Sequence, residues 1–147
     1  MITVTLNVTD PPSVKRSKLA KFWDFITTKI WGSVSDAHYD LARKSFNNLV
    51  AGTPVDTGWA QASWRASLDG SLVAMLPDPG GVAGAYADRV PTFDVPRKRS
   101  RNHNMVDYVI TNDRKNIEVI NSVSPHAGFV ERALEQSVAS VKFRINL

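Results

Sequence analysis

The chain has 147 residues and a formal net charge of +4 at pH 7, with 43% hydrophobic and 22% charged residues. This is the size of one ordinary domain with a real core, and the composition excludes a disordered chain. The absence of cysteine excludes disulfides and thiolate zinc sites, and it fits assembly in a reducing cytoplasm. No apolar run approaches the roughly 20 residues that cross a bilayer, so no membrane partner is expected.

The amino-terminal segment alternates between apolar and polar residues, which is typical of a β-strand. Residues 1–9 place Ile2, Val4, Leu6 and Val8 on one face. Two prolines then end the strand, and Ser13 is suited to cap a following helix.

A helical pattern occupies residues 14–50, where apolar residues recur at spacings of three or four. Gly32 and Ser33 form a weak point, so one continuous helix and two helices with a kink are both open. A helix this long cannot be covered fully by a small domain, so we expect its exposed part to contact another subunit. The residues expected at this interface are Phe22, Trp23, Ile30, Trp31 and Phe46.

Residues 53–64 combine a helix stop, a new helix start and a strand entry. Pro54 cannot continue a helix, and the carboxylate of Asp56 is predicted to cap a short new helix. We interpret this segment as a structural corner rather than a catalytic site. Its principal residues are Pro54, Asp56, Thr57, Gly58 and Trp64.

Two hairpins are predicted beyond the corner. The first joins residues 64–68 to 72–76 through Asp69-Gly70, and the second joins residues 106–110 to 117–120. Between them, residues 77–104 are rich in glycine and proline, which predicts a flexible loop with room for a brief helix at 82–90.

The last predicted helix starts at Ser124-Pro125 and runs to about residue 138, and a short tail, suited to a strand, follows. The predicted fold class is α+β, in a single domain that covers residues 1–147. A long amino-terminal helix, with or without a kink, and a carboxy-terminal helix pack on a small antiparallel sheet of hairpins.

The loop carries a basic cluster of Arg97, Lys98, Arg99 and Arg101. Such a cluster can pair with an acidic protein surface or neutralise the phosphates of DNA. A solvated loop without a specific contact is the other interpretation.

No residue pattern indicates catalysis. The three histidines, His38, His103 and His126, have no convincing set of partner ligands, and His38 is expected on a solvated helix face. No nucleophile elbow, phosphate-binding loop or H-E-x-x-H sequence occurs. We therefore expect a protein that is not an enzyme and has no metal or cofactor.

Two blocks of sequence resemble a family of phage proteins. Pro54-Val55-Asp56-Thr57-Gly58, followed by Ala60, Ala62, Ser63 and Trp64, is similar to the P-x-D-T-G-x-x-x-x-S signature of tailed-phage head–tail junction proteins. These are lambdoid-type tail-component, neck or tail-completion proteins. The second block, about 65 residues later, looks like the family's asparagine-containing strand followed by an aromatic–alanine pair and a glutamate. It runs from residue 120 to residue 131, and its principal residues are Asn121, Pro125, His126, Ala127 and Glu131.

The second block departs from the family in two places. His126 stands where the family usually has tyrosine, and residues 132–136 continue a helix where a glycine-rich turn often follows. These departures bear on which ring layer the protein occupies, with neck, tail-completion and tail-terminator layers all open, and not mainly on its fold.

The resemblance implies a structural α+β subunit of a closed ring in the virion, between the portal or connector and the tail. A hexamer is expected and a dodecamer is the alternative. The implied partners are further copies of the chain and the adjacent portal, connector and tail proteins, with DNA passing transiently through the lumen. The alternative function is a small basic nucleic-acid-binding protein, and an enzyme such as a nuclease is the third.

Overall fold

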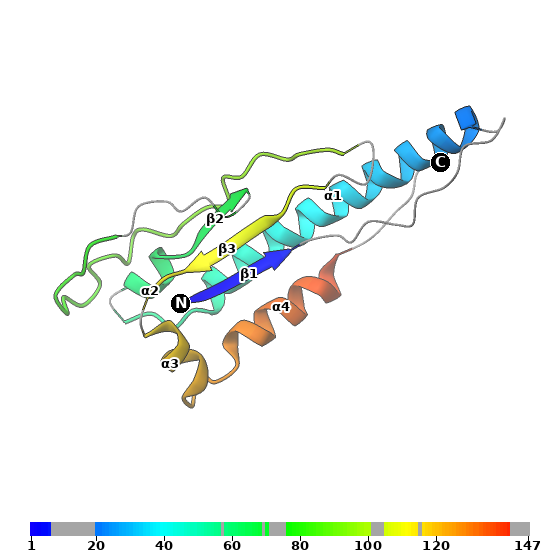
Figure 1. The fold of residues 1–147 in the computed structure, drawn as a ribbon. Helices are drawn as coiled ribbons and strands as arrows, with labels where there is room; N and C mark the ends of the chain where they lie inside the picture. Colours follow the sequence, from blue (N-terminus) through cyan, green and yellow to red (C-terminus); the bar gives the residue numbers. More distant parts are fainter. Residues whose placement is uncertain are drawn as a thin grey trace.

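The computed structural model describes residues 1–6, 20–56, 58–68, 70, 76–100, 105–114 and 116–141. Its elements are β1 (Ile2–Leu6), α1 (Ala20–Gly52), α2 (Trp59–Ala62), β2 (Arg65–Leu68), β3 (Tyr108–Asn112), α3 (Ile117–Ser122) and α4 (Phe129–Ser140). Figure 1 shows α1 running along one face of the sheet, with α4 beside it and with α2 and α3 at one end. The fold is therefore α+β, as the sequence predicts.

The three described strands form one antiparallel sheet in the order β1-β3-β2. The central strand β3 pairs with both neighbours, so that Ile110 lies opposite Val4 of β1 and opposite Ala66 of β2. Tyr108, Ile110 and Asn112 alternate with less buried residues along β3. This period of two places one face of the sheet against the helices.

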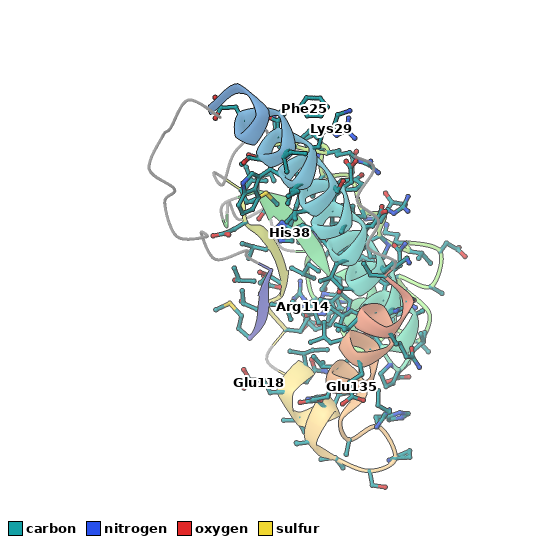
Figure 2. The ribbon with its side chains drawn as sticks, turned by 90° about the vertical axis from the view of Figure 1, so that its right-hand side faces the viewer. Phe25, Lys29, His38, Arg114, Glu118 and Glu135 are labelled. Atoms are coloured by element: carbon teal, nitrogen blue, oxygen red, sulfur yellow. The ribbon has the colours of Figure 1, made fainter. Side chains whose placement is uncertain are left out.

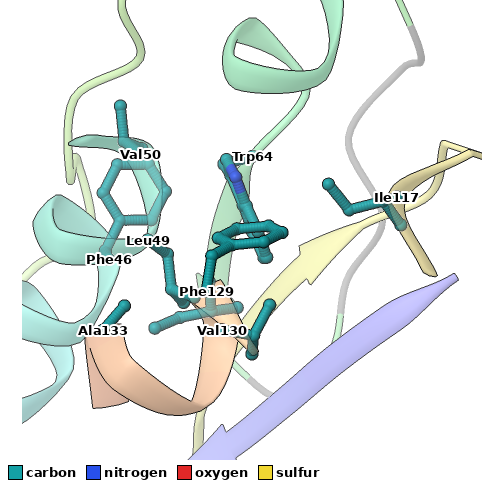
Figure 3. Packing of buried hydrophobic residues seen from close by; sticks show 9 residues of the cluster. Phe46, Leu49, Val50, Trp64, Ile117, Phe129, Val130 and Ala133 are labelled. Carbon is teal, nitrogen blue, oxygen red and sulfur yellow. The ribbon is translucent and has the colours of Figure 1, made fainter. Parts of the chain in front are cut away.

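The main core fills the space between the sheet, α1 and α4 (Figure 3). Its buried members are Phe46, Leu49, Val50, Trp64, Ile110, Ile117, Phe129, Val130 and Ala133. On α1, the spacing of three and four residues between members brings their side chains to one helix face. Trp64, directly before β2, has no exposed surface, and its indole Nε1 donates a hydrogen bond of 2.7 Å to Thr53 Oγ1.

The second predicted hairpin is wrong. Residues 117–120 belong to helix α3, and β3 pairs instead with β1 and β2. Ile117 is fully buried and Ile120 packs against the core, whereas Val119 is exposed. Burial at positions i and i+3 is a helical pattern, although β-branched residues favour a strand when they are read locally. For the first hairpin, residues 71–75 lie outside the described part of the chain.

Helix α1 runs from Ala20 to Gly52 without interruption at Gly32, so the alternative of two separate helices is wrong. The predicted helix start and Ser13 lie outside the described residues. The last helix begins at Phe129 rather than at Pro125, because residues 123–128 form turns. The predicted brief helix at 82–90 is wrong, since successive turns occupy that segment, as in the bonds from Ala87 N to Gly84 O and from Arg89 N to Tyr86 O.

The amino-terminal part of α1 extends beyond the sheet and α4 (Figure 1). Phe25 is 53% exposed there, and Ile30 is half-buried. Trp31 and Phe46 are only 8% and 1% exposed within a single chain. The expectation that Trp31 and Phe46 are exposed interface residues is therefore wrong, because both side chains are buried within the chain's own core. The side chains of Phe22 and Trp23 lie outside the described structure.

The loop of residues 77–100 packs on the rest of the domain. Val95 lies in a second buried cluster with Ala42 and Tyr108, and the side chain of Tyr86 is also buried. Among the helices that the structure describes, none has the length and apolarity of a membrane span.

Candidate functional site

The two motif blocks meet at the end of the molecule that carries α2 and α3 (Figure 1), where they line a groove of about 580 Å³. The first block contributes Pro54, Val55, Asp56, Gly58 and Trp59, and the second contributes Ser124 and His126. Helix α3 and the segment after it add Val119, Ile120 and Val123, and the loop adds Asp78 and Pro79. We call this the motif groove. Its volume lies in the range of small-molecule ligand pockets.

Gly58 allows the loop to approach the corner. Its φ is +79°, and a Cβ built there would lie 2.7 Å from the carbonyl carbon of Tyr86 and 2.9 Å from Ala87 N. Any side chain would therefore push the loop away. Tyr86 is fixed in turn, because its Oη donates a hydrogen bond of 2.7 Å to Pro77 O.

Asp56 does not cap α2. The N-cap residue is Gly58, and no side-chain capping bond is present among the described residues. The left-handed conformation of Gly58 starts the helix later than the sequence suggests, and α2 is only 4 residues long. The carboxylate of Asp56 therefore remains exposed at the motif groove, while its backbone O accepts a hydrogen bond from Gly84 N. Thr57 lies outside the described part.

A buried arginine that the sequence did not single out supports this corner. Arg114 is 6% exposed; its Nε donates to Ser63 Oγ at 2.7 Å, and its Nη2 donates to Leu76 O at 2.6 Å. The carboxylate of Asp113 lies 3.8 Å away. Burial lowers the pKa of Arg114 from its usual value, while Asp113 raises it, and a guanidinium stays protonated in proteins. The sequence around Arg114 contains no pattern that predicts burial of a basic residue directly after a strand.

The second motif block holds α3 and α4 together. Asn121 Oδ1 accepts a hydrogen bond of 3.0 Å from Val130 N, in the first turn of α4. Its Nδ2 donates to Glu131 Oε2 at 3.1 Å, and its backbone O accepts from Gly128 N at 2.7 Å. Asn121 therefore supplies the cap that Gly128, the N-cap residue of α4, cannot supply itself. Pro125, His126 and Ala127 lie exposed in the turn between the helices.

The basic cluster lies on α1, apart from the residues that line the motif groove. Arg99 Nη2 contacts Asp36 Oδ2 at 2.6 Å, and Arg97 Nη1 contacts Asp36 Oδ1 at 3.2 Å. The Arg97 guanidinium also stacks 4.7 Å from the Tyr39 ring centroid. Two cations of the cluster thus pair with the acidic face of α1. Lys98 is exposed, and Arg101 lies outside the described residues.

His38 does not lie on a solvated face. It is buried, and its ring centroid lies 5.0 Å from that of Tyr108 in an edge-to-face arrangement. Figure 2 shows His38 on the side of α1 that faces the sheet. In the part of the chain that the structure describes, no group of three or more histidines and carboxylates could hold a metal ion. His103 is outside that part.

No protein-family model, curated protein or solved structure matches this chain. The function must therefore be inferred from its own residues and their arrangement.

Proposed function

We propose that this chain is a structural subunit of a ring at the head–tail junction of a tailed phage, where it joins the portal or connector to the tail. The observation that carries the proposal is the motif groove. Two blocks that are far apart in sequence, and that both resemble blocks of this phage family, line the same surface. Such convergence is expected when both blocks serve one structural site.

The exposed apolar residues support a role in assembly. Val55, Val119 and Val123 are each more than half exposed, and all three line the motif groove. Single exposed apolar residues are normal on a protein surface, but a group in one concave site marks an interaction surface.

The shape of the domain supports the same role. Helix α1 continues past the described strands and α4 (Figure 1), so that part of it lies beyond the cover that these elements provide. In the described sheet, β1 and β2 are the edge strands, and neighbouring subunits in a ring can pair or cover such edges.

In this role the chain is a structural component of the virion and not an enzyme. Its partners are further copies of itself, in a hexamer or alternatively a dodecamer, and the adjacent portal, connector and tail proteins. Neck, tail-completion and tail-terminator layers all fit this description.

Nucleic-acid binding is the weaker alternative. Arg97 and Arg99 would have to leave Asp36 before they could neutralise phosphates. That exchange of one ion pair for another reduces the gain from a phosphate contact.

Mass measurement of the purified chain, alone and mixed with the portal or connector protein of its own gene cluster, tests the proposal. We expect a defined oligomer of six or twelve copies, visible as a ring by electron microscopy. A chain that remains monomeric alone and does not bind the connector would contradict the ring function.

A further inference from the structure

We infer that the amino-terminal part of α1 from one copy docks in the motif groove of the next copy. This inference rests on the proposed ring and names the two surfaces that would form it. We call residues 24–30 of α1 the helix tip. The contact joins two different surfaces, so each subunit would use its tip on one side and its groove on the other.

The helix tip presents an exposed aromatic ring next to a positive charge. Phe25 is 53% exposed, and the ammonium group of Lys29, one helical turn later, lies 5.7 Å from its ring centroid. Figure 2 shows both side chains pointing outward at the end of α1 that is far from α3. An exposed phenylalanine beside a lysine is an amphipathic knob that suits an apolar site with an acidic rim.

The motif groove has these properties. Its lining includes Val55, Val119 and Val123, and its described charged residues are Asp56 and Asp78, with no lysine or arginine among them. Phe25 can enter the apolar part while Lys29 approaches the carboxylates. Asp24, the other charged residue of the tip, lies about 140° around the helix from Lys29. The face formed by Phe25 and Lys29 is therefore complementary to the groove in both polarity and charge.

The tip of a given chain cannot fill its own groove. The groove begins at Pro54, and the helix between Lys29 and that point is roughly 35 Å long at about 1.5 Å per residue. Figures 1 and 2 place the tip and α3 at opposite ends of the molecule. The occupant must belong to another molecule, and repeated contacts between unlike surfaces close into a ring when the rotation permits.

Two single variants and their mixture test the contact. Phe25→Asp removes the apolar side chain of the tip and leaves the groove intact, whereas Val119→Asp places a charge in the groove and leaves the tip intact. Val138→Asp is the matched control, because Val138 is 65% exposed on α4 and does not line the groove. We expect each of the first two variants to raise the concentration needed for assembly at least about tenfold, and the control to assemble normally.

Mixing the two defective variants gives the sharper result. An intact tip on one variant can enter the intact groove of the other, but neither complex can grow further. Sedimentation or mass photometry should therefore show one-to-one pairs in the mixture and monomers in each variant alone. Circular dichroism of each variant checks that it folds.

Disulfide cross-linking provides an independent test with milder substitutions. Because the chain has no natural cysteine, any disulfide must join the introduced residues. The double variant Phe25→Cys and Val119→Cys should form a ladder of disulfide-linked oligomers under oxidising conditions. The pair Phe25→Cys and Val138→Cys should give none. This test does not require the complete ring to survive the substitution.

Three results would overturn the contact. The first is that the wild type forms a ring and that neither Phe25→Asp nor Val119→Asp changes its assembly. The proposed ring function would then stand, but this interface would not. The second is the absence of a cysteine ladder together with a ring that forms only on the connector. The third is loss of connector binding in Val119→Asp alone, which would assign the groove to a different protein.

Discussion

The guanidinium of Arg114 lies 4.0 Å from the ring centroid of Trp59, so a buried cation stacks on an aromatic residue of the first motif block. The same guanidinium hydrogen-bonds Ser63 and the backbone of Leu76. One side chain that follows β3 thus joins α2 to the residue that precedes the loop. These contacts make the corner a rigid wall of the motif groove.

Replacing Arg114 by alanine should lower the free energy of unfolding by about 2–3 kcal/mol, because it leaves buried acceptors without a charged donor. Arg114→Lys should recover only part of this loss, since an ammonium cannot reproduce the planar fork. Urea unfolding monitored by tryptophan fluorescence measures both. Arg43→Ala is the control, because its ion pair with Asp40 is exposed and should contribute less than about 0.5 kcal/mol. Equal stabilities for Arg114→Ala and Arg43→Ala would contradict this role.

Gly58→Ala should destabilise the chain by about 2 kcal/mol or more, because left-handed strain adds to a backbone clash with Tyr86. Gly80→Ala is a matched control: its φ is +63°, but nothing lies within 4 Å of the added Cβ. It should cost only the conformational strain of about 1 kcal/mol. If chemical denaturation gives equal losses of unfolding free energy for the two variants, the close approach of the loop is not what requires glycine at position 58.

Asn121→Ala should lower the free energy of unfolding by about 1 kcal/mol, since α4 loses its side-chain cap. The thermal midpoint, followed by circular dichroism, should fall by roughly 2–4 °C for a domain of this size. Ser122→Ala, which removes only an exposed bond to Val119 O, should change the midpoint less. A larger effect for Ser122→Ala would argue against the capping role.

Replacing Asp36 by asparagine should free Arg99 and leave Arg97 with only its 3.6 Å contact to Asp40, and so increase affinity for DNA severalfold at low salt. Fluorescence anisotropy with a DNA duplex, repeated over a range of salt concentrations, measures this change. Asp24→Asn removes the same charge at the helix tip, apart from the basic cluster, and is the control. The nucleic-acid alternative would be favoured if the wild type binds DNA tightly and in a salt-dependent manner, and if Asp36→Asn does not change that affinity.

Burial raises the pKa of Tyr108 above its usual value, and this outweighs the hydrogen bond that Lys98 N donates to the phenol oxygen. The neutral phenol is therefore favoured in the folded state. Stability should be fully present below about pH 10, where an unfolded tyrosine ionises, and should fall as pH rises from there through the raised pKa. Denaturant titrations at several alkaline pH values should show a steeper loss for the wild type than for Tyr108→Phe. Equal slopes would contradict the assignment.

Elements that depend on local periodicity and on local breaks could be predicted from the order of the residues alone. The apolar stripe predicts α1, Pro54 marks its end, and the alternation at the amino terminus predicts β1, because these signals repeat within a few residues. The first motif block also predicts a structural corner, and Pro54, Gly58 and Trp64 lie at that corner in the structure.

Which segments pack together could not be predicted in this way, because it depends on contacts between residues far apart in the chain. Residues 117–120 are helical because Ile117 and Ile120 face the core together, and β1 pairs with β3 from more than 100 positions away. The burial of Arg114 and His38 likewise depends on partners that are distant in sequence. Pairing and burial are non-local properties, whereas periodicity reports only on neighbouring residues.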